Sequence, residues 1–182
     1  MARVPYLDAA DLDPGYRSLL DRPINLFRAL ANDPDGLREF HRIGEWIRYG
    51  GQLEPRLREL AILRVGYLTG NEYEYSHHIR IAQEFGVTPH DLNLVCRTAQ
   101  SPVPDGPAAA VLDAATEITQ RLSPSDATWR RMVEALGVAG AVELVLVVAH
   151  YNAVVRVLDS LRVDVEPDYL RHLDEYPMST KD

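Results

Sequence analysis

Cysteine is almost missing from this sequence. Cys96 is the only one among 182 residues, so the chain can form neither an internal disulfide nor a Cys-x-x-Cys redox pair. A lone thiol fits a protein of the reducing cytoplasm. The single cysteine excludes secreted domains stabilised by internal disulfides and enzymes that work with two cysteines.

Basic residues are also few. The chain has 19 Lys and Arg against 27 Asp and Glu, which gives a formal net charge of −8. A nucleic-acid backbone or an anionic membrane surface needs a positive field on its protein partner. We therefore expect no nucleic-acid partner.

Long apolar runs are absent as well. The most apolar stretch, Val142–Val155, contains Glu143, His150 and Asn152, and it is shorter than the ~20 residues of a membrane span. The first residues contain no apolar signal segment. These features predict a soluble, cytoplasmic protein without a membrane partner.

The sequence does have a sustained helical period. From Ile24 onward apolar residues recur at the spacing of an α-helix, Gly and Pro punctuate the pattern, and no strand-like alternation appears. We predict an all-α, single-domain helical array over residues 23–182, built around an antiparallel helix pair. The Pro-rich residues 101–107 form a linker between two helical clusters. The expected helices span about residues 24–32, 35–48, 55–69, 72–85, 89–99, 106–121, 125–136 and 138–162.

Two segments suggest how the domain is covered. Residues 1–22 show no period and are interpreted as an arm that packs on the surface or on a neighbouring subunit. The expected helix 138–162 is apolar on most of its circumference, and such a helix must be covered all round. It is therefore central, or an interface, or both, and we predict a homo-oligomer.

A carboxylate and a histidine stand out on the expected antiparallel pair. Glu59 shares an apolar face with Ile62 and Leu63, and His78 faces inward on the next helix, whereas His77 is expected on a solvent or interface face. The Thr-Gly-Asn turn between the helices is tight enough to bring Glu59 and His78 into contact. A buried Glu–His pair exchanges protons near neutral pH.

Each of these residues also has a structural interpretation. In this interpretation Glu59 pairs with Arg56 or with an arginine of another helix, and His78 is a satisfied core residue. Glu74 lies three residues after Asn71, the spacing of a capping box. Glu74 and His78 have a spacing that suits two metal ligands, but no second pair is evident, and we expect no metal.

The segment Arg56–Phe85 resembles the signature of the carboxymuconolactone decarboxylase and alkylhydroperoxidase-like superfamily: an acid on one helix, a Thr-Gly turn, and a helix that carries histidine. Asp126–Trp129 and the apolar run that ends at Tyr151-Asn152 are similar too, so the resemblance covers about residues 24–166. In the peroxidase-type branch, a Glu, two cysteines and a His form a proton relay. Aligned on the turn, Asn71 and Glu74 occupy the cysteine positions, so the resemblance excludes a thiol peroxidase.

The resemblance then implies the decarboxylase side of the superfamily: a cofactor-independent decarboxylase or isomerase acting on a small carboxylated or lactone substrate. It implies that His78 transfers the proton, Glu59 orients it, and Glu74 is a second acid. It also implies a homotrimer or homohexamer. Candidate substrate-binding residues are Tyr73, Tyr75, Trp129, Tyr151 and Asn152. The alternatives are a non-catalytic ligand-binding or assembly module on the same scaffold and, third, a metal-dependent enzyme.

Overall fold

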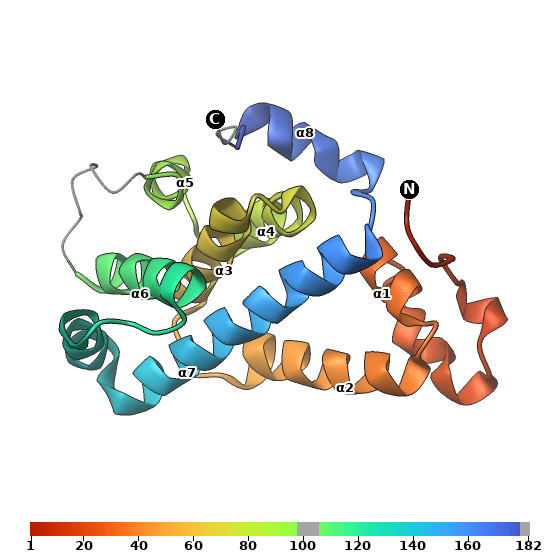
Figure 1. The fold of residues 1–182 in the computed structure, drawn as a ribbon, viewed down its shortest axis with the longest axis horizontal. Coiled ribbons are helices and arrows are strands. Elements are labelled where there is room, and N and C mark those ends of the chain that lie inside the picture. The colour runs from red at the N-terminus through yellow and green to blue at the C-terminus, as the bar shows by residue number, and fades with distance from the viewer. Residues whose placement is uncertain (98–105, 179–182) are drawn as a thin grey trace.

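The computed structural model describes residues 1–97 and 106–178, and this part of the chain is helical, with no strand (Figure 1). The all-α prediction is confirmed. The elements are η1 (Ala9–Asp11), η2 (Pro14–Leu20), α1 (Asn25–Leu30), α2 (Pro34–Glu45), the π turn η3 (Trp46–Gly50), α3 (Pro55–Thr69), α4 (Glu72–Glu84), α5 (Pro89–Val95), α6 (Pro107–Arg121), α7 (Asp126–Leu161) and α8 (Pro167–Glu175).

Proline and capping side chains begin most of these helices. Five α-helices have Pro in their first turn, where its fixed φ suits the helix and its missing N–H costs nothing. Asp33 caps α2 by accepting a hydrogen bond from the Gly36 amide, and Ser125 caps α7 in the same way from Thr128. These local signals are why most helix starts follow from the sequence.

The expected division of α7 at Gly137 is present. The helices expected over residues 125–136 and 138–162 are the two parts of this 36-residue element, and the Gly137 backbone between them is not helical, with a φ of 68° and a ψ of 171°. The helix expected at 89–99 ends at Val95, and α8 was not expected at all. Most of the predicted linker 101–107 lies outside the described residues.

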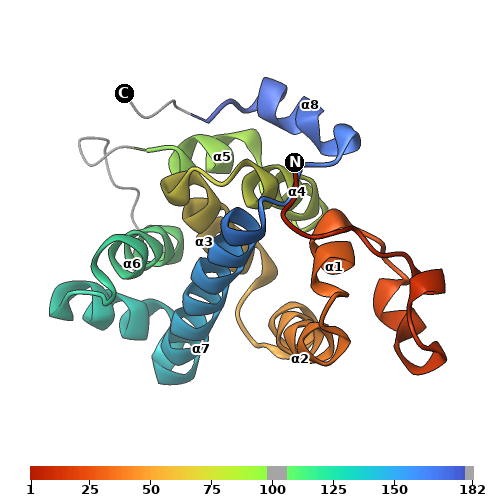
Figure 2. The same ribbon diagram turned by 45° about the vertical axis from the view of Figure 1, so that its right-hand side comes forward.

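Helix α7 runs through the middle of the molecule and packs against α3 and α6, while α3 and α4 form the predicted antiparallel pair (Figures 1 and 2). The buried Leu144, Val147 and Val148 of α7 belong to one hydrophobic core with Leu60 and Leu63 of α3. By length and composition α7 could cross a membrane. Its place in this fold identifies it as the central helix of the array.

One edge of α7 stays uncovered in the single chain. Val138, Val142 and Leu146 are 63%, 47% and 50% exposed, and they follow one another at four-residue spacing. Helix α7 is therefore central in the fold and also has one solvent-exposed apolar edge. The sequence alone could not decide between these two positions.

The N-terminal arm packs on its own chain. The Arg3 amide donates to the Leu161 carbonyl at 2.8 Å, and the Leu7 amide donates to the Arg28 carbonyl at 3.1 Å. Leu12 and Leu20 form a small second apolar cluster with Ala31 and Leu37. Residues 1–22 thus hold α1 and α2 and reach the end of α7.

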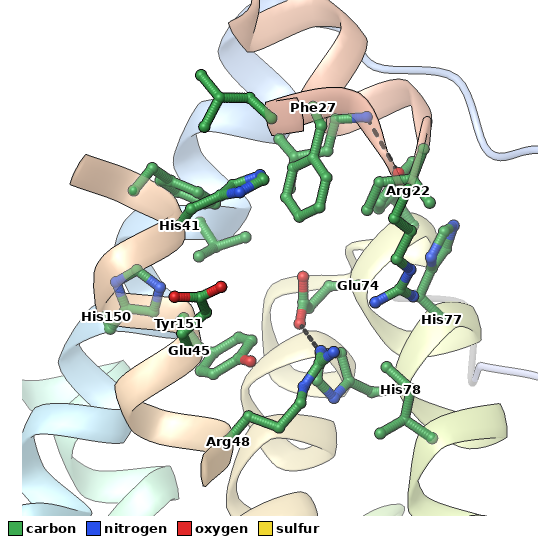
Figure 3. A pocket seen from close by; sticks show the side chains of 18 of the residues that line it. Arg22, Phe27, His41, Glu45, Arg48, Glu74, His77, His78, His150 and Tyr151 are labelled. Carbon is green, nitrogen blue, oxygen red and sulfur yellow. Dashed lines mark hydrogen bonds and ion pairs between the residues drawn. The ribbon is translucent and has the colours of Figure 1, made fainter. Parts of the chain in front are cut away.

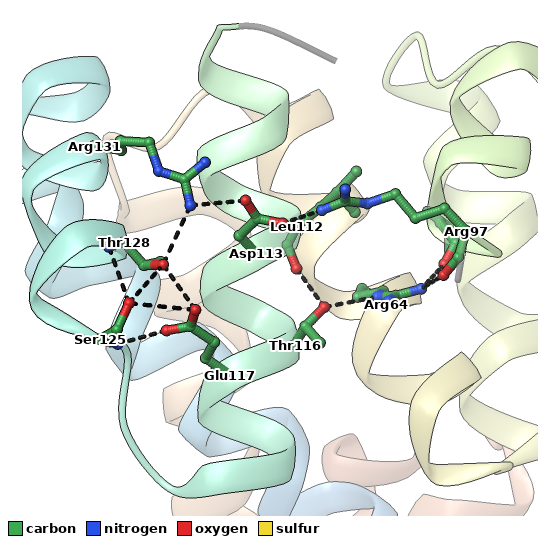
Figure 4. Close-up of polar contacts among 10 residues, drawn as sticks. Arg64, Arg97, Leu112, Asp113, Thr116, Glu117, Ser125, Thr128 and Arg131 are labelled. Atoms are coloured by element: carbon green, nitrogen blue, oxygen red, sulfur yellow. Dashed lines mark hydrogen bonds and ion pairs between the residues drawn. The ribbon is translucent and has the colours of Figure 1, made fainter. Parts of the chain in front are cut away.

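A polar cluster joins the other side of the array (Figure 4). Asp113 of α6 pairs with Arg97 and, at 2.8 Å, with Arg131 of α7. Arg64 of α3 donates to the Thr116 hydroxyl at 2.9 Å, and the Thr128 hydroxyl donates to Glu117 at 2.9 Å. These contacts fix α6 between α3 and the first half of α7, far from the pocket described below.

Candidate active site

The turn between α3 and α4 sets the geometry of the site. Gly70 ends α3 with a φ of 70°, a conformation that glycine adopts without strain, and the Asn71 side chain accepts a hydrogen bond from the Glu74 amide at 2.8 Å. A Cβ at Gly66 would lie 3.1 Å from the Tyr75 nitrogen, so glycine also lets the two helices approach closely. Side chains that face each other across this hairpin must therefore meet.

His78 lies between two carboxylates in this hairpin. Its Nδ1 is 2.7 Å from Oε2 of Glu59. Its Nε2 is 3.0 Å from Oε1 of Glu74, the contact drawn in Figure 3. The second oxygen of Glu59 accepts a hydrogen bond from Nε of Arg58 at 3.0 Å. All four side chains are buried. We call Glu59, His78 and Glu74 the triad.

The predicted contact of Glu59 with His78 is thus present, but the partner suggested for Glu59 was wrong. Arg56 pairs with Asp91 at the start of α5, and Arg58, the immediate neighbour of Glu59, takes its place. Glu74 follows only half of the capping-box pattern, since its amide is capped by Asn71 while its carboxylate contacts His78.

The charges of the triad stabilise one another. Burial alone would lower the pKa of His78, but the Glu74 and Glu59 carboxylates outweigh it and raise this pKa to about 9. Burial would raise the pKa of Glu59, but His78 and Arg58 hold it below its usual value. The two carboxylates therefore favour the imidazolium form of His78 at neutral pH, with a hydrogen bond at Nδ1 and an ion pair at Nε2.

Glu74 and His78 of the triad border a cavity of about 320 Å³ (Figure 3), and Glu59 does not line it. Glu74 and His78 of α4 form one wall and Tyr151 of α7 another, while Phe27 and neighbouring residues of α1 close the apolar side. The arm takes part as well, through residues 18–22, which the sequence had suggested only as a surface or interface segment. A pocket of this size suits a small molecule.

The structure separates the predicted substrate-binding residues into two groups. Tyr73 and Tyr151 line the cavity, but Tyr75, Trp129 and Asn152 do not. The Tyr75 hydroxyl lies 3.3 Å from Cys96 Sγ in the core, Trp129 packs against the core near the start of α7, and the Asn152 amide donates to Thr119 of α6. Placing these three at the pocket was wrong, because they lie on faces of α4 and α7 that point toward α6 and the core.

His77 also departs from the prediction. It is buried instead of facing solvent, stacked between Tyr73 at 4.1 Å and Tyr169 at 3.6 Å between ring centroids. Its Nε2 lies 2.7 Å from Glu166, and burial nevertheless lowers its pKa. The reason is α8, an unexpected helix that covers this face of α4.

The pocket residues that were not predicted include the basic side chains of Arg22, His41, Arg48 and His150. His150 interrupts the apolar run of α7, and that interruption is the one sequence signal that could have pointed to it. The others come from the arm, α2 and the π turn, whose positions depend on tertiary packing. Across residues 1–97 and 106–178, no group of three or more His, Cys, Asp and Glu side chains has the arrangement of a metal site.

The fold is all-α, and comparisons with known proteins agree with this class. The model of the carboxymuconolactone decarboxylase family matches residues 34–117. This match, over less than half of the chain, agrees with the resemblance that the sequence predicts. None of the curated proteins matches the sequence.

Solved structures of low sequence identity share the fold. The alkylhydroperoxidase AhpD core protein from Ralstonia eutropha JMP134, an uncharacterized peroxidase-related protein, aligns with a TM-score of 0.80 and 18% identity over 92% of this chain and 94% of its own. A cysteine-to-alanine variant of the debrominase Bmp8 in complex with 2,3,4-tribromopyrrole aligns with a TM-score of 0.80 and 17% identity over 97% and 98%. A peroxidase-related protein from Silicibacter sp. TM1040 has a TM-score of 0.74 and 16% identity over 93% and 97%.

Proposed function

We propose that this protein is a cofactor-independent acid–base enzyme, a decarboxylase or isomerase of a small carboxylated or lactone substrate. The observation that carries the proposal is the triad: a histidine held as a cation between two carboxylates at the wall of a small-molecule pocket. A positioned general acid or base contributes about 10²- to 10⁴-fold in rate.

The arrangement of the triad supports a path for the proton between His78 and the substrate. His78 is protonated at neutral pH, and Glu59, tied to Arg58, holds Nδ1. Nε2 lies 3.0 Å from the Glu74 carboxylate, which lines the pocket. Glu74 is thus the group through which a proton passes between His78 and the substrate, while Glu59 orients the imidazole.

The position of Glu74 fits this chemistry. It stands where the peroxidase-type branch has its second cysteine, so a carboxylate replaces a sulfur at the end of the same relay. A carboxylate can exchange a proton but cannot enter a disulfide cycle. The scaffold therefore supports proton transfer in place of thiol redox chemistry.

The rest of the pocket favours an anionic substrate with an apolar body. Arg22 and Arg48 line the cavity, and neither forms an ion pair with another residue that the structure describes, so each can receive a carboxylate. Phe27 and Phe40 offer an apolar surface. The debrominase of the same fold binds a small ring compound, 2,3,4-tribromopyrrole.

We further propose a soluble, cytoplasmic homotrimer or homohexamer in which the exposed edge of α7 is covered by another subunit. The charge of −8 and the lone cysteine support the location, and Val138, Val142 and Leu146 support the assembly. The alternative is a ligand-binding module without catalysis, favoured by the burial of the triad.

The test is a thermal-shift and turnover screen with lactones, muconate-like acids and aromatic catabolites. A substrate should be turned over by the wild type and about 10²- to 10⁴-fold more slowly by His78→Gln and Glu74→Gln. His90→Gln is the matched control, because His90 is exposed on α5 and does not line the pocket. Full turnover in His78→Gln would refute the proposed acid–base mechanism. A compound that stabilises all variants and is never turned over would favour the binding module.

A further inference from the structure

Tyr151 differs from the other tyrosines near the pocket. The Tyr73 hydroxyl accepts a hydrogen bond from the Leu26 amide and donates one to Glu166, both at 3.1 Å, and the Tyr75 hydroxyl lies against Cys96. Tyr151 is only 8% exposed, yet its hydroxyl forms no hydrogen bond with any residue in the described part of the chain. The Tyr151 hydroxyl is not sealed from solvent, and Tyr151 lines the cavity, so a ligand there can accept its hydrogen bond.

The hydroxyl is placed beside the triad. The Tyr151 ring meets the His78 ring edge-on, with centroids 5.1 Å apart and an interplanar angle of 84°. Tyr151 and Glu74 come from different helices, α7 and α4, and both line the cavity (Figure 3). A small substrate between these helices would contact Glu74 and the Tyr151 hydroxyl together.

The Tyr151 hydroxyl stays protonated and can therefore donate a hydrogen bond. Burial and the nearby Glu74 and Glu59 carboxylates raise the pKa of Tyr151 well above its usual value of 10. Tyr151 therefore neither takes up the substrate proton as a phenolate nor loses its own. It can only donate a hydrogen bond or accept one weakly.

We propose that Tyr151 is a catalytic residue that donates a hydrogen bond to the carbonyl oxygen of the substrate as that oxygen becomes an enolate. This inference rests on the proposed acid–base function and defines the substrate class more closely. The substrate is a small anion whose carbonyl group is adjacent to, or conjugated with, the carbon that exchanges the proton.

The electrons balance without a cofactor. In an isomerisation, a C–H bond breaks, its proton goes to the Glu74 carboxylate, and the electron pair moves onto the carbonyl oxygen. In a decarboxylation, a C–C bond breaks, carbon dioxide leaves, and the pair moves onto the same oxygen. In both cases the Tyr151 hydroxyl stabilises the oxyanion, and the enolate then collapses as a carbon takes a proton from Glu74. In the isomerisation this is the proton that Glu74 received, and in the decarboxylation water resupplies it to the triad.

Phenols test this role, because a phenolate resembles an enolate in shape and charge. The wild type is titrated at one pH with a series of nitro- and halogen-substituted phenols of increasing acidity, and binding is measured by calorimetry. We expect tighter binding along the series. Tyr151→Phe should bind the most acidic phenols about ten- to a hundredfold more weakly, as expected when a hydrogen bond to a charged acceptor is removed.

Tyr75→Phe is the matched control, since it also removes a buried hydroxyl but one outside the pocket; it should bind the phenols as the wild type does. Tyr151→Phe should melt no lower than the wild type, because its hydroxyl has no partner to lose. Equal phenol affinity in Tyr151→Phe and wild type, or no phenol binding by the wild type, would overturn the role of Tyr151. The acid–base proposal is judged separately, by turnover in His78→Gln.

Discussion

A single imidazole with a carboxylate at each ring nitrogen is the central feature of this protein at the scale of residues. Its cation is stabilised by Glu59 and Glu74 more than burial destabilises it. The same arrangement makes the two carboxylates unequal. Glu59 also binds Arg58 and is fixed, whereas Glu74 borders the pocket.

The first prediction is a shifted titration of His78. In an NMR titration of the histidine ring protons, His78 should change state near pH 9. Glu74→Gln removes one stabilising charge and should bring this pKa down. Glu72→Gln changes an exposed carboxylate one residue before Tyr73 and should leave the His78 titration unchanged. A midpoint near 6.5 in the wild type would contradict the charge state assigned to the triad.

The second prediction concerns stability against pH. The folded pKa of His78 lies above the ordinary value of 6.5, so its contribution is complete below about pH 6.5 and is lost as the pH rises through about 9. The free energy of unfolding should therefore fall over this window, by up to about 3 kcal/mol. Urea denaturation at several pH values measures the fall. His78→Gln should remove most of this dependence of the unfolding free energy on pH. An unchanged dependence in that variant would show that another group causes it.

At the scale of elements, a carboxylate of α7 holds the loop that leads into α3. Glu143 is buried and accepts hydrogen bonds from the amides of Gln52 at 2.8 Å and Leu53 at 2.9 Å. A Cβ on Gly51 would lie 2.1 Å from the Glu143 carboxylate. The loop and the helix therefore fit only if residue 51 has no side chain.

This fit gives the third prediction. Gly51→Ala should lower the free energy of unfolding by about 1–3 kcal/mol, because the Glu143 carboxylate must move away from the amides it accepts from. Gly44→Ala is the control: a Cβ there meets no atom within 4 Å, and alanine favours the helix. Thermal or urea unfolding compares the two. Equal stability of Gly51→Ala and wild type would show that Glu143 does not hold the loop.

Elements also show what the sequence can predict. The hairpin of α3 and α4, with Gly70 and Asn71 at its turn, follows from local signals, and so does the meeting of Glu59 and His78. His77, expected on a solvent or interface face, is instead buried because α8 of the same chain covers that face. No residue near His77 in sequence signals that contact.

The pocket illustrates the same limit. Its walls come from the arm, α1, α2, α4 and α7, and only tertiary packing decides which residues of each helix face inward. Tyr151 and Asn152 are neighbours in sequence, yet one borders the cavity and the other hydrogen-bonds to Thr119. Aromatic residues near a recognised motif are therefore a weak guide to a binding site.

At the scale of the whole molecule, the exposed edge of α7 predicts assembly. Leu146→Glu would place a charge within a buried subunit contact and should shift the protein toward monomers in analytical ultracentrifugation. Leu170→Glu, on α8, alters a leucine that is 47% exposed away from this edge and should leave the assembly intact. A wild type that sediments as a monomer would refute the oligomer.

Glu166 ties together distant parts of the chain. It accepts hydrogen bonds from the Asn25 amide and the Tyr73 hydroxyl and lies against His77, so the entry of α1 and the outer face of α4 depend on a residue near the far end of the sequence. Synthesis must therefore reach residue 166 before the start of α1 can make this contact. A chain that stops earlier lacks one of the contacts that hold the α1 wall of the pocket.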